Sequence, residues 1–569
     1  MPTPTKLIAE LQTIRAAFDD VSLVKKETII QELARVKINK AKDLLELSET
    51  LLFLLAYPHH KLFLQKLNLL LEKTRGGIKT MIRKTKKTGP FENTGLTGTH
   101  VKACFSFELI EWLLHEYPNA ITLDSFGSDP ELVYTLLSPL LPATLREHFN
   151  EGGYETVEQW LAFTVSKDRY EQLSFIARLF KDAALPMNIR NQHFDQLEMY
   201  VDVDLNVVPS RMDIRGTPRP IYFHKESIIR KIDLPSILKE PLPVPMVLNE
   251  KEKQHFISAM RLQLLSLYRE TDPATYADSN DLHIFNTGRG MDIVLIGMDA
   301  DHRQPLDAYI GFMAFKNRLP YAYGGAWMLG KMAKIGINVF PSYRGGESAW
   351  FFAQLMRVYK QVFQPAYFVA EPYQVGRNNP EGIETGAFWF YYRLGFRPVQ
   401  RKLQELAKKE FERLLQNKNH KTSKRTLEQL VEDEMVLLIN NDSGILKFKY
   451  DTASLSAALT KYIRQRYKGD TRAAEQEAVS TLCADLHISD DATYATLKPG
   501  LEKIALYIQA GGSIKKWNES DRQLLLNMIA EKAIGRDSEY AIHYAKHEKL
   551  EQLLSELVVK GQDKKFYNR

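Results

Sequence analysis

The feature that most constrains this chain is an apolar strand that enters a glycine-rich turn and leaves it as a helix, between Ile337 and Ala349. The stretch reads Ile-Asn-Val-Phe-Pro-Ser-Tyr-Arg-Gly-Gly-Glu-Ser-Ala. Glycine allows close approach of the backbone, and the start of a helix offers free N–H groups together with the positive end of its dipole. The turn Arg344-Gly345-Gly346 is therefore predicted to attract an anionic group at the end of a strand.

The residues around this turn predict an α/β domain. Apolar segments separated by short turns indicate an antiparallel meander, and a helix and one more apolar strand follow the glycine turn. We expect a helix over 250–269, strands over 281–285, 291–298, 307–315, 320–329 and 331–340, a helix over 348–363 and a strand over 367–370. The crossover helix makes the last two strands parallel neighbours, and ligands of such sheets bind beyond the carboxyl ends of the strands.

A second informative stretch runs from Ala387 to Phe396 and reads Ala-Phe-Trp-Phe-Tyr-Tyr-Arg-Leu-Gly-Phe. Together the two stretches resemble the GNAT superfamily of N-acetyltransferases, whose members use acyl-CoA. The family pattern Ala-x-x-Leu-Tyr-x-Lys-x-Gly-Phe aligns without a gap, with Phe390 in place of Leu and Arg393 in place of Lys. The resemblance implies that Tyr391 is the acid that protonates the departing CoA thiolate. The alternative is that Tyr391 belongs to an aromatic helix packed in the core.

The glycine turn matches the pyrophosphate loop of the same family in part. That loop is written Gln/Arg-x-x-Gly-x-Gly/Ala, so Arg344 fits its first position and Ala349 its last, whereas Glu347 replaces the middle glycine. A carboxylate beside a pyrophosphate is unfavourable by about 1 kcal/mol. Alternatively, Glu347 is an acid that the helix dipole favours in the first turn. The departure leaves both CoA binding and catalytic competence open at this point.

The resemblance implies acetyl-CoA or another acyl-CoA as co-substrate and an amine as acceptor. It assigns CoA binding to the end of the strand and to the loop, at Asn338, Val339, Phe340, Arg344, Gly345, Gly346, Ser348 and Ala349. As the base that takes the proton of the amine we single out Glu371, because it stands at the carboxyl end of its predicted strand. The alternative is a solvated acid before Pro372.

Length and composition limit the number of domains, the kinds of metal site and the partners that this chain can have. With 569 residues, of which 44% are hydrophobic, the chain is long enough for several globular domains. Its two cysteines are too few for a disulfide framework or a Cys-based zinc site, and we predict no metal site, with His59-His60 interpreted as a loop. A net charge of +6 is weak evidence for a polyanionic partner. Short apolar runs and the absence of a signal-peptide pattern predict a cytoplasmic protein without a membrane partner.

The patterns along the chain predict an α/β central domain with a GNAT-like mixed sheet, flanked by mainly α-helical N- and C-terminal regions. We expect a helical region over 1–195, a short strand-containing segment with a proline-rich connector over 196–247, the GNAT-like domain over 248–400 and a mainly helical region over 401–569.

The leading functional prediction is an acyl-CoA-dependent N-acyltransferase. One alternative is a catalytically silent GNAT-like scaffold, motivated by Glu347 in the loop and by the large helical flanks. Another is a transferase that takes its acyl group from aminoacyl-tRNA or acyl-carrier protein, guided by the basic segments 73–87 and 402–425. Outside that alternative we do not expect nucleic acid as a partner, and a homo-oligomer stays open.

Overall fold

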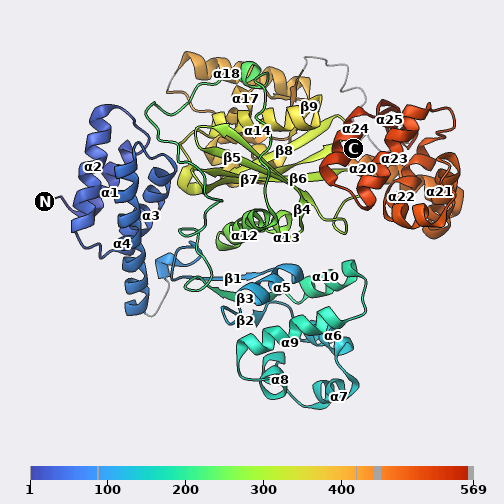
Figure 1. Ribbon diagram of the computed structural model, residues 1–569, viewed down its shortest axis with the longest axis horizontal. Coiled ribbons are helices and arrows are strands. Elements are labelled where there is room, and N and C mark those ends of the chain that lie inside the picture. Colours follow the sequence, from blue (N-terminus) through green and yellow to red (C-terminus); the bar gives the residue numbers. More distant parts are fainter. Residues whose placement is uncertain (1, 86–88, 418, 440–449, 562–569) are drawn as a thin grey trace.

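The computed structural model describes residues 2–85, 89–417, 419–439 and 450–561. These residues form a mixed α/β protein with N-terminal helices, a central mixed sheet of eight strands and a C-terminal helical region. Figure 1 shows the N-terminal and the C-terminal helices on opposite sides of the central sheet, and a smaller lobe with its own sheet beneath it. The central sheet carries the candidate site.

The N-terminal helices pack through leucines that recur at helical spacing. On the third helix Leu44, Leu47 and Leu51 are buried. The helix ends at Ala56, because Pro58 cannot continue it. The four helices are α1 (Pro4–Ile14), α2 (Asp20–Arg35), α3 (Ala41–Ala56) and α4 (Lys61–Thr85).

The prediction of a helical region over 1–195 is incomplete, because the lobe contains two strands in this range. The strands β1 (His100–Cys104) and β2 (Ile121–Phe126) both pair antiparallel with β3 (Met199–Asp204). Strands of five and six residues show too few repeats of the two-residue period to stand out from helical neighbours. The predicted half-exposed strand after residue 196 is confirmed as β3, but its pairing joins it to the lobe rather than to the connector.

Helices complete the lobe, and the connector that follows has little regular structure. The helices of the lobe are α5 (Phe107–Glu116), α6 (Pro130–Leu137), α7 (Ala143–Glu151), α8 (Val157–Thr164), α9 (Arg169–Asp182) and α10 (Met187–Gln196), with single turns η1 (Gly89–Phe91) and η2 (Ser138–Leu140). The connector contains the short helix α11 (Leu234–Ile237).

The central sheet has the strand order β10-β11-β9-β8-β7-β6-β5-β4. The predicted meander is confirmed, since β4 to β8 pair antiparallel in sequence order, and the predicted parallel pair is confirmed as β8 and β9. The strands are β4 (Ala277–Gly288), β5 (Met291–Met298), β6 (Ala308–Lys316), β7 (Leu319–Leu329), β8 (Met332–Val339), β9 (Tyr367–Ala370), β10 (Arg397–Pro398) and β11 (Met435–Leu438).

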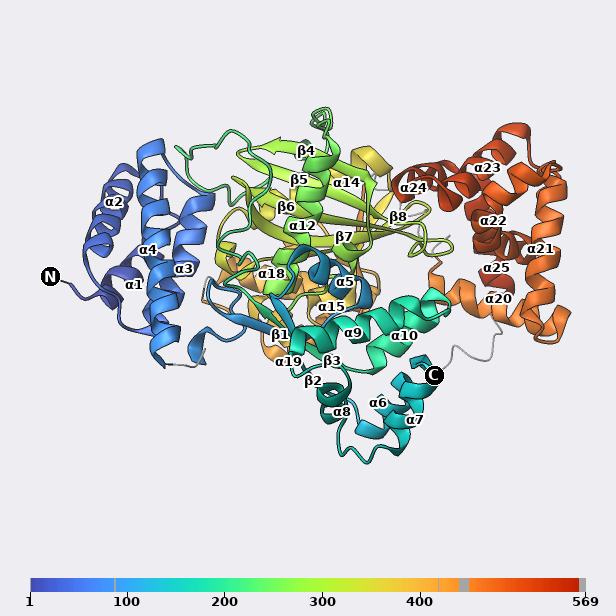
Figure 2. The same ribbon diagram turned by 60° about the horizontal axis from the view of Figure 1, so that its bottom comes forward.

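Helices cover both faces of this sheet. Alternate residues of β6 point to opposite faces, so Phe315 packs against Phe256 of one helix while Phe312 packs against Phe351 of another. In Figure 2, α12 crosses in front of the strands. The first face carries α12 (Glu250–Ser266) and α13 (Asp272–Thr275), and the second carries α14 (Ser348–Phe363).

The chain returns to the central sheet after residue 400, where the predicted α/β domain ends. The strand β11 inserts between β9 and β10 and pairs antiparallel with both. Near the C-terminal end, α24 (Asp537–Lys546) packs on the sheet, and the Tyr540 hydroxyl donates to the Leu306 carbonyl, just before β6, at 2.6 Å. Insertion of a four-residue strand from a distant segment is a tertiary event that local patterning does not encode.

Short helices follow β9, and longer ones form the C-terminal region. After β9 come α15 (Pro372–Val375), α16 (Pro380–Thr385) and α17 (Ala387–Arg393). The later helices are α18 (Arg401–Gln416), α19 (Lys424–Leu430), α20 (Thr452–Tyr467), α21 (Thr471–Asp485), α22 (Asp491–Gly511), α23 (Glu519–Ala533), α24 (Asp537–Lys546) and α25 (Glu548–Gly561).

Candidate functional site

The parallel strands β8 and β9 separate after a short contact. Their pairing covers Met332 to Lys334 on β8, which then continues to Val339, whereas β9 ends at Ala370. Strand β7 accompanies β8 along this whole length. The second half of β8 therefore has one paired edge and, among the described residues, one edge without a strand partner. Such an edge can hydrogen-bond an extended ligand.

The glycine turn lies directly beyond this open edge. The single turn η3 (Pro341–Tyr343) joins β8 to it, and α14 begins at Ser348. Gly345 is exposed and has a φ of +82°, a conformation that favours glycine. The amides of Gly345, Ser348 and Ala349 have no acceptor among the described residues. The Gly346 amide, which was also predicted to bind the pyrophosphate, instead donates to the Tyr343 carbonyl at 3.1 Å. The turn thus offers N–H groups at the positive end of a sixteen-residue helix.

Glu347, the residue that departs from the family pattern, points into the protein. Its side chain is fully buried, and its carboxylate accepts from Lys316 Nζ at 2.9 Å and from Arg289 Nη2 at 2.6 Å. Burial works to raise the pKa of Glu347, but the two cations outweigh it and hold the pKa below its usual value. Burial lowers the pKa of Lys316 to about 8 despite the ion pair, so both groups are charged at neutral pH. The negative charge of Glu347 is thus balanced by the charges of Lys316 and Arg289 in the interior of the protein.

The N-terminal helices hold the turn from the other side. The Tyr57 hydroxyl accepts a hydrogen bond from the Glu347 amide at 3.1 Å, so this N–H is not free for a ligand. Arg15 Nη2 donates to the Arg344 carbonyl at 2.9 Å. No local pattern predicts these contacts, since Tyr57 and Glu347 are 290 residues apart. These contacts pack the N-terminal helices against the glycine turn.

The other predicted CoA-binding residues line the path from β8 to α14. Arg344 is half-exposed and pairs with Glu381 at 2.5 Å, a surface contact that contributes little to stability and can be exchanged for a phosphate. Asn338 is exposed on the open half of β8. Phe340 is buried and stacks on Tyr323 with ring centroids 5.2 Å apart, so its role is to hold the strand in place.

Tyr391 lies in an aromatic cluster between α17 and α14. Its ring packs against Phe352, Phe390 and Phe396, and 2% of the residue is exposed. Burial raises the pKa of the Tyr391 hydroxyl far above its usual value, so the group stays protonated. The hydroxyl has no hydrogen-bond partner among the described residues, which leaves a buried donor available. The packing that the aromatic-core interpretation requires is present, and Tyr391 is not among the residues that line the cavity beside Glu371.

A cavity of about 490 Å³ lies on the α12 face of the sheet and reaches the open edge of β8. Glu371 and Asn338 line it at this end. The Glu371 carboxylate is half-exposed and pairs with Lys334 Nζ at 2.8 Å. The predicted base thus borders a cavity large enough for a small substrate, next to the place where β8 and β9 separate.

At another part of the same cavity, His302 forms a pair with an acid that the sequence analysis did not single out. His302 Nδ1 lies 2.6 Å from Asp299 Oδ1, and its Nε2 is buried without a partner among the described residues. The spacing of three residues is the signal that reasoning from sequence could have used. The imidazole stacks on Tyr276 with centroids 3.7 Å apart, so its orientation is set on two sides.

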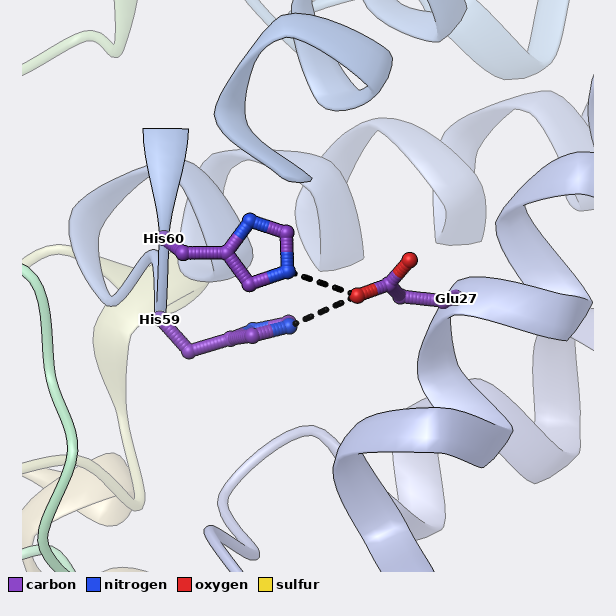
Figure 3. A group of neighbouring side chains, drawn as sticks. All are labelled: Glu27, His59 and His60. Atoms are coloured by element: carbon purple, nitrogen blue, oxygen red, sulfur yellow. Dashed lines mark hydrogen bonds and ion pairs between the residues drawn. The ribbon is translucent and has the colours of Figure 1, made fainter. Parts of the chain in front are cut away.

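A cluster of Glu27, His59 and His60 has the spacing of a metal site, but its hydrogen bonds account for it without one (Figure 3). His60 Nε2 lies 2.7 Å from Glu27 Oε1, while Nδ1 of the same ring accepts from the Phe63 amide at 3.0 Å. The proton therefore sits on Nε2, the atom that a metal would need bare. Lys66 Nζ occupies the other carboxylate oxygen at 2.8 Å. An ammonium beside the cluster further opposes a cation.

Comparison with protein-family models, with curated proteins and with solved structures yields no match to this chain. The likeness to the GNAT superfamily therefore stays a prediction from the two sequence motifs. Among the described residues, no helix combines the length and the apolar composition needed to cross a membrane. The basic segment 73–87 forms the end of α4 as far as Thr85, and its last residues lie outside the described part of the chain.

Proposed function

We propose that this protein is an acyl-CoA-dependent N-acyltransferase that transfers an acetyl or longer acyl group to an amine. The observation that carries the proposal is the separation of β8 from β9 directly before the glycine turn at the start of α14. An open strand edge followed by free helix amides suits a ligand with an amide-containing arm and a diphosphate. Acyl-CoA has both parts in this order.

In this proposal the pantetheine arm pairs with the open edge of β8 from Asn338 to Phe340. The diphosphate binds the amides of Gly345, Ser348 and Ala349 and draws Arg344 away from Glu381. Burial of the Glu347 side chain supports this assignment, because the carboxylate that opposed it in the sequence is paired with two cations in the interior. The adverse charge does not face the ligand.

The chemical step needs one acid and one base. The amine nitrogen attacks the thioester carbonyl carbon, with the oxyanion stabilised by a β8 amide near Val339. The new C–N bond forms as the C–S bond breaks, and the thiolate takes a proton from the Tyr391 hydroxyl. Glu371 accepts the proton that the amine loses. Free donor character at Tyr391 and the position of Glu371 on the cavity wall support these roles.

Calorimetry with a panel of acyl-CoAs tests the donor. The loop is tested with Ser348→Asp, which places a carboxylate in the first turn of α14, where the dipole favours it, but where it repels a diphosphate. We expect acyl-CoA affinity to fall about tenfold or more with the melting temperature unchanged or higher. The neutral control Ser348→Asn should bind acyl-CoA nearly as the unchanged protein does. Absence of heat across the whole panel refutes the donor assignment.

A second candidate is the catalytically silent scaffold, and one contact favours it. The Tyr57 hydroxyl accepts the hydrogen bond of the Glu347 amide. In a loop that no longer binds a ligand, such a side chain would take the place of the ligand. This candidate predicts no acyl-CoA binding in either Tyr57→Phe or the unchanged protein. If Tyr57→Phe binds acyl-CoA and the unchanged protein does not, the hydroxyl is a competitor for the diphosphate and the loop is still functional.

A further inference from the structure

The N-terminal helical region borders another cavity, of about 480 Å³. It lies between the C-terminal half of α4 and the segment 37–39 that leads into α3, which runs beside α4 in Figure 2. The lining residues that the structure describes include none from the glycine turn or from the cavity beside Glu371. A cavity of this volume suits a small organic molecule.

Two consecutive glycines of α4, Gly76 and Gly77, line this cavity. A Cβ on Gly76 would have no atom within 4 Å, and a Cβ on Gly77 would lie 3.2 Å from Leu44 Cδ2 of α3. Glycine is an unfavourable residue inside a helix, so the stability of α4 does not explain the pair. Its effect is to bring α3 close at Gly77 and to leave room for a ligand at Gly76.

The cavity has an aliphatic side. Leu70, Thr74, Gly77 and Met81 recur at spacings of four, three and four residues, so they share one face of α4. Leu44 of α3 lies opposite this face, and all five residues line the cavity. An aliphatic chain that displaces water from this surface is stabilised by the hydrophobic effect.

The charged side chains described along the cavity are all basic. Lys37, Lys73 and Lys84 line it, and within the described part of the chain no aspartate or glutamate does. Lys73 Nζ donates to three carbonyls at the end of α2 at 2.7 to 3.3 Å, so its charge is held in place without a carboxylate. Lys37 and Lys84 have no hydrogen-bond or ion-pair partner among the described residues. The cavity therefore favours a ligand with negative charge.

The start of α3 adds the positive end of a helix dipole. The helix has sixteen residues and no side-chain cap, and the amides of residues 41–43 have no acceptor in the part of the chain that the structure describes. Asn39 and Leu44, on either side of this turn, both line the cavity. The acid of the turn, Asp43, is buried and accepts from Thr5 Oγ1 of α1 at 2.8 Å. Its carboxylate is thus engaged with α1 rather than with the cavity.

The register of the two helices brings Lys84 to the same place. Because α3 and α4 are antiparallel and Leu44 lies beside Gly77, residue 41 is level with residue 80. A long helical side chain leans toward the N-terminus of its own helix, which directs Lys84 back over Thr80, and both residues line the cavity. An anion at the start of α3 therefore meets free amides and an ammonium together.

We propose that this cavity binds an amphiphilic anion, which has an aliphatic chain and one carboxylate or phosphate head group. The head group binds the amides at the start of α3 and the Lys84 ammonium, and the chain lies along the face of α4 from Met81 toward Leu70. The lysines repel a cationic amphiphile of the same chain length, and an anion without a chain makes no aliphatic contact. The site is independent of the proposed acyl transfer, and no step of that reaction passes through it.

Calorimetry on the full chain with defined amphiphiles tests the ligand class. The probes are decanoate, decyl phosphate and decylamine, all below their micelle concentrations, together with acetate and inorganic phosphate. We expect decanoate or decyl phosphate to bind with one molecule per chain, and the tighter of the two identifies the head group. Decylamine, acetate and inorganic phosphate should bind at least about tenfold more weakly.

Two pairs of variants locate the site. Thr80→Glu adds a carboxylate at the level of the head group, in a helix pair with Lys84 that favours folding. Its affinity for the long-chain anion should fall about tenfold or more, whereas that of the neutral Thr80→Gln should stay within about threefold. Lys84→Gln should weaken binding about fivefold. Lys79→Gln removes the same charge from an exposed position of α4 outside the described lining and should change the affinity by less than about twofold.

Four results would overturn the amphiphile site: decylamine binding as tightly as the anions, no binding by either long-chain anion, equal losses in Thr80→Glu and Thr80→Gln, or equal effects of Lys84→Gln and Lys79→Gln. Ser348→Asp separates this site from acyl-CoA binding at the glycine turn. The long-chain anion should bind that variant unchanged, and loss of binding there would place the anion at the turn and overturn the cavity site. If the expected results hold but no acyl-CoA binds, the cavity site is supported and the transferase proposal fails.

Discussion

Replacing Tyr391 with phenylalanine removes one hydroxyl and leaves the ring in its cluster. Since that hydroxyl is buried and unpartnered, its desolvation costs the folded protein about 1–3 kcal/mol that no hydrogen bond returns. We expect Tyr391→Phe to stabilise the protein by about 1 kcal/mol, which raises the melting temperature by roughly 2–4 °C for a domain of this size. If the hydroxyl is the acid for the leaving thiolate, turnover falls about 10²-fold with acyl-CoA affinity unchanged.

A matched variant gives the opposite sign for stability. Tyr359 is as deeply buried in the same domain, but its hydroxyl donates to the Ile310 carbonyl at 2.6 Å. Tyr359→Phe should therefore destabilise the protein by about 1 kcal/mol, with turnover per folded molecule unchanged. Thermal unfolding and free-thiol release from acyl-CoA, measured on both variants, supply the two readouts.

The combination of results decides between the interpretations of Tyr391. If Tyr391→Phe is more stable and turns over more slowly, the Tyr391 hydroxyl has a catalytic role and destabilises the fold. Higher stability with full turnover removes Tyr391 from the mechanism and leaves the aromatic-core interpretation. A loss of stability in Tyr391→Phe comparable to that of Tyr359→Phe refutes the premise that the Tyr391 hydroxyl has no partner in the folded protein.

Two further predictions concern stability. Glu347→Gln leaves two buried cations without their counter-charge, so the free energy of unfolding measured in urea should fall by about 3 kcal/mol. In the control Glu405→Gln, which removes an exposed ion pair within a helix, it should fall by less than about 1 kcal/mol. Equal losses in the two variants would contradict the buried ion cluster. Burial lowers the pKa of His59 and His547 to about 4 and that of His224 to about 2, from 6.5. As the pH falls, the histidines of the unfolded chain are protonated before those of the folded protein. The free energy of unfolding should therefore be highest above pH 6.5 and fall toward pH 4 by up to about 1.4 kcal/mol per pH unit for each histidine. A urea midpoint that stays constant across this range would contradict the prediction.

Local pattern sufficed for the centre of the fold. Strand β5, strand β9 and helix α14 have the predicted bounds. The two strands are mostly apolar segments bounded by turn residues, and the helix has apolar residues at helical spacing. The glycine turn was also predictable, since a pair of glycines before a helix requires no distant contact to form. Parallel pairing of β8 and β9 followed from the crossover helix alone.

Distant contacts determined what the site can do. From its sequence neighbours, Glu347 is predicted to oppose a diphosphate, whereas in the structure its carboxylate is buried and paired with Lys316 and Arg289. Tyr57, which follows the last residue of α3, contacts the loop at Glu347, 290 residues later in the chain. These contacts of Glu347 and Tyr57 form only when distant segments pack together. A local sequence pattern does not give the charge or shape of the surface that another segment contributes.

The sequence by itself determined the order of strands and helices in the centre and the glycine turn before α14, because these arise from periodicity and from the backbone freedom of glycine. Only the tertiary structure decided that β11 joins the sheet, that the Tyr391 hydroxyl is enclosed without a partner, and that Gly311, Gly325 and Gly336 align. The physical reason is that each of these depends on register between segments, which is set by burial of both faces of the sheet rather than by local preference.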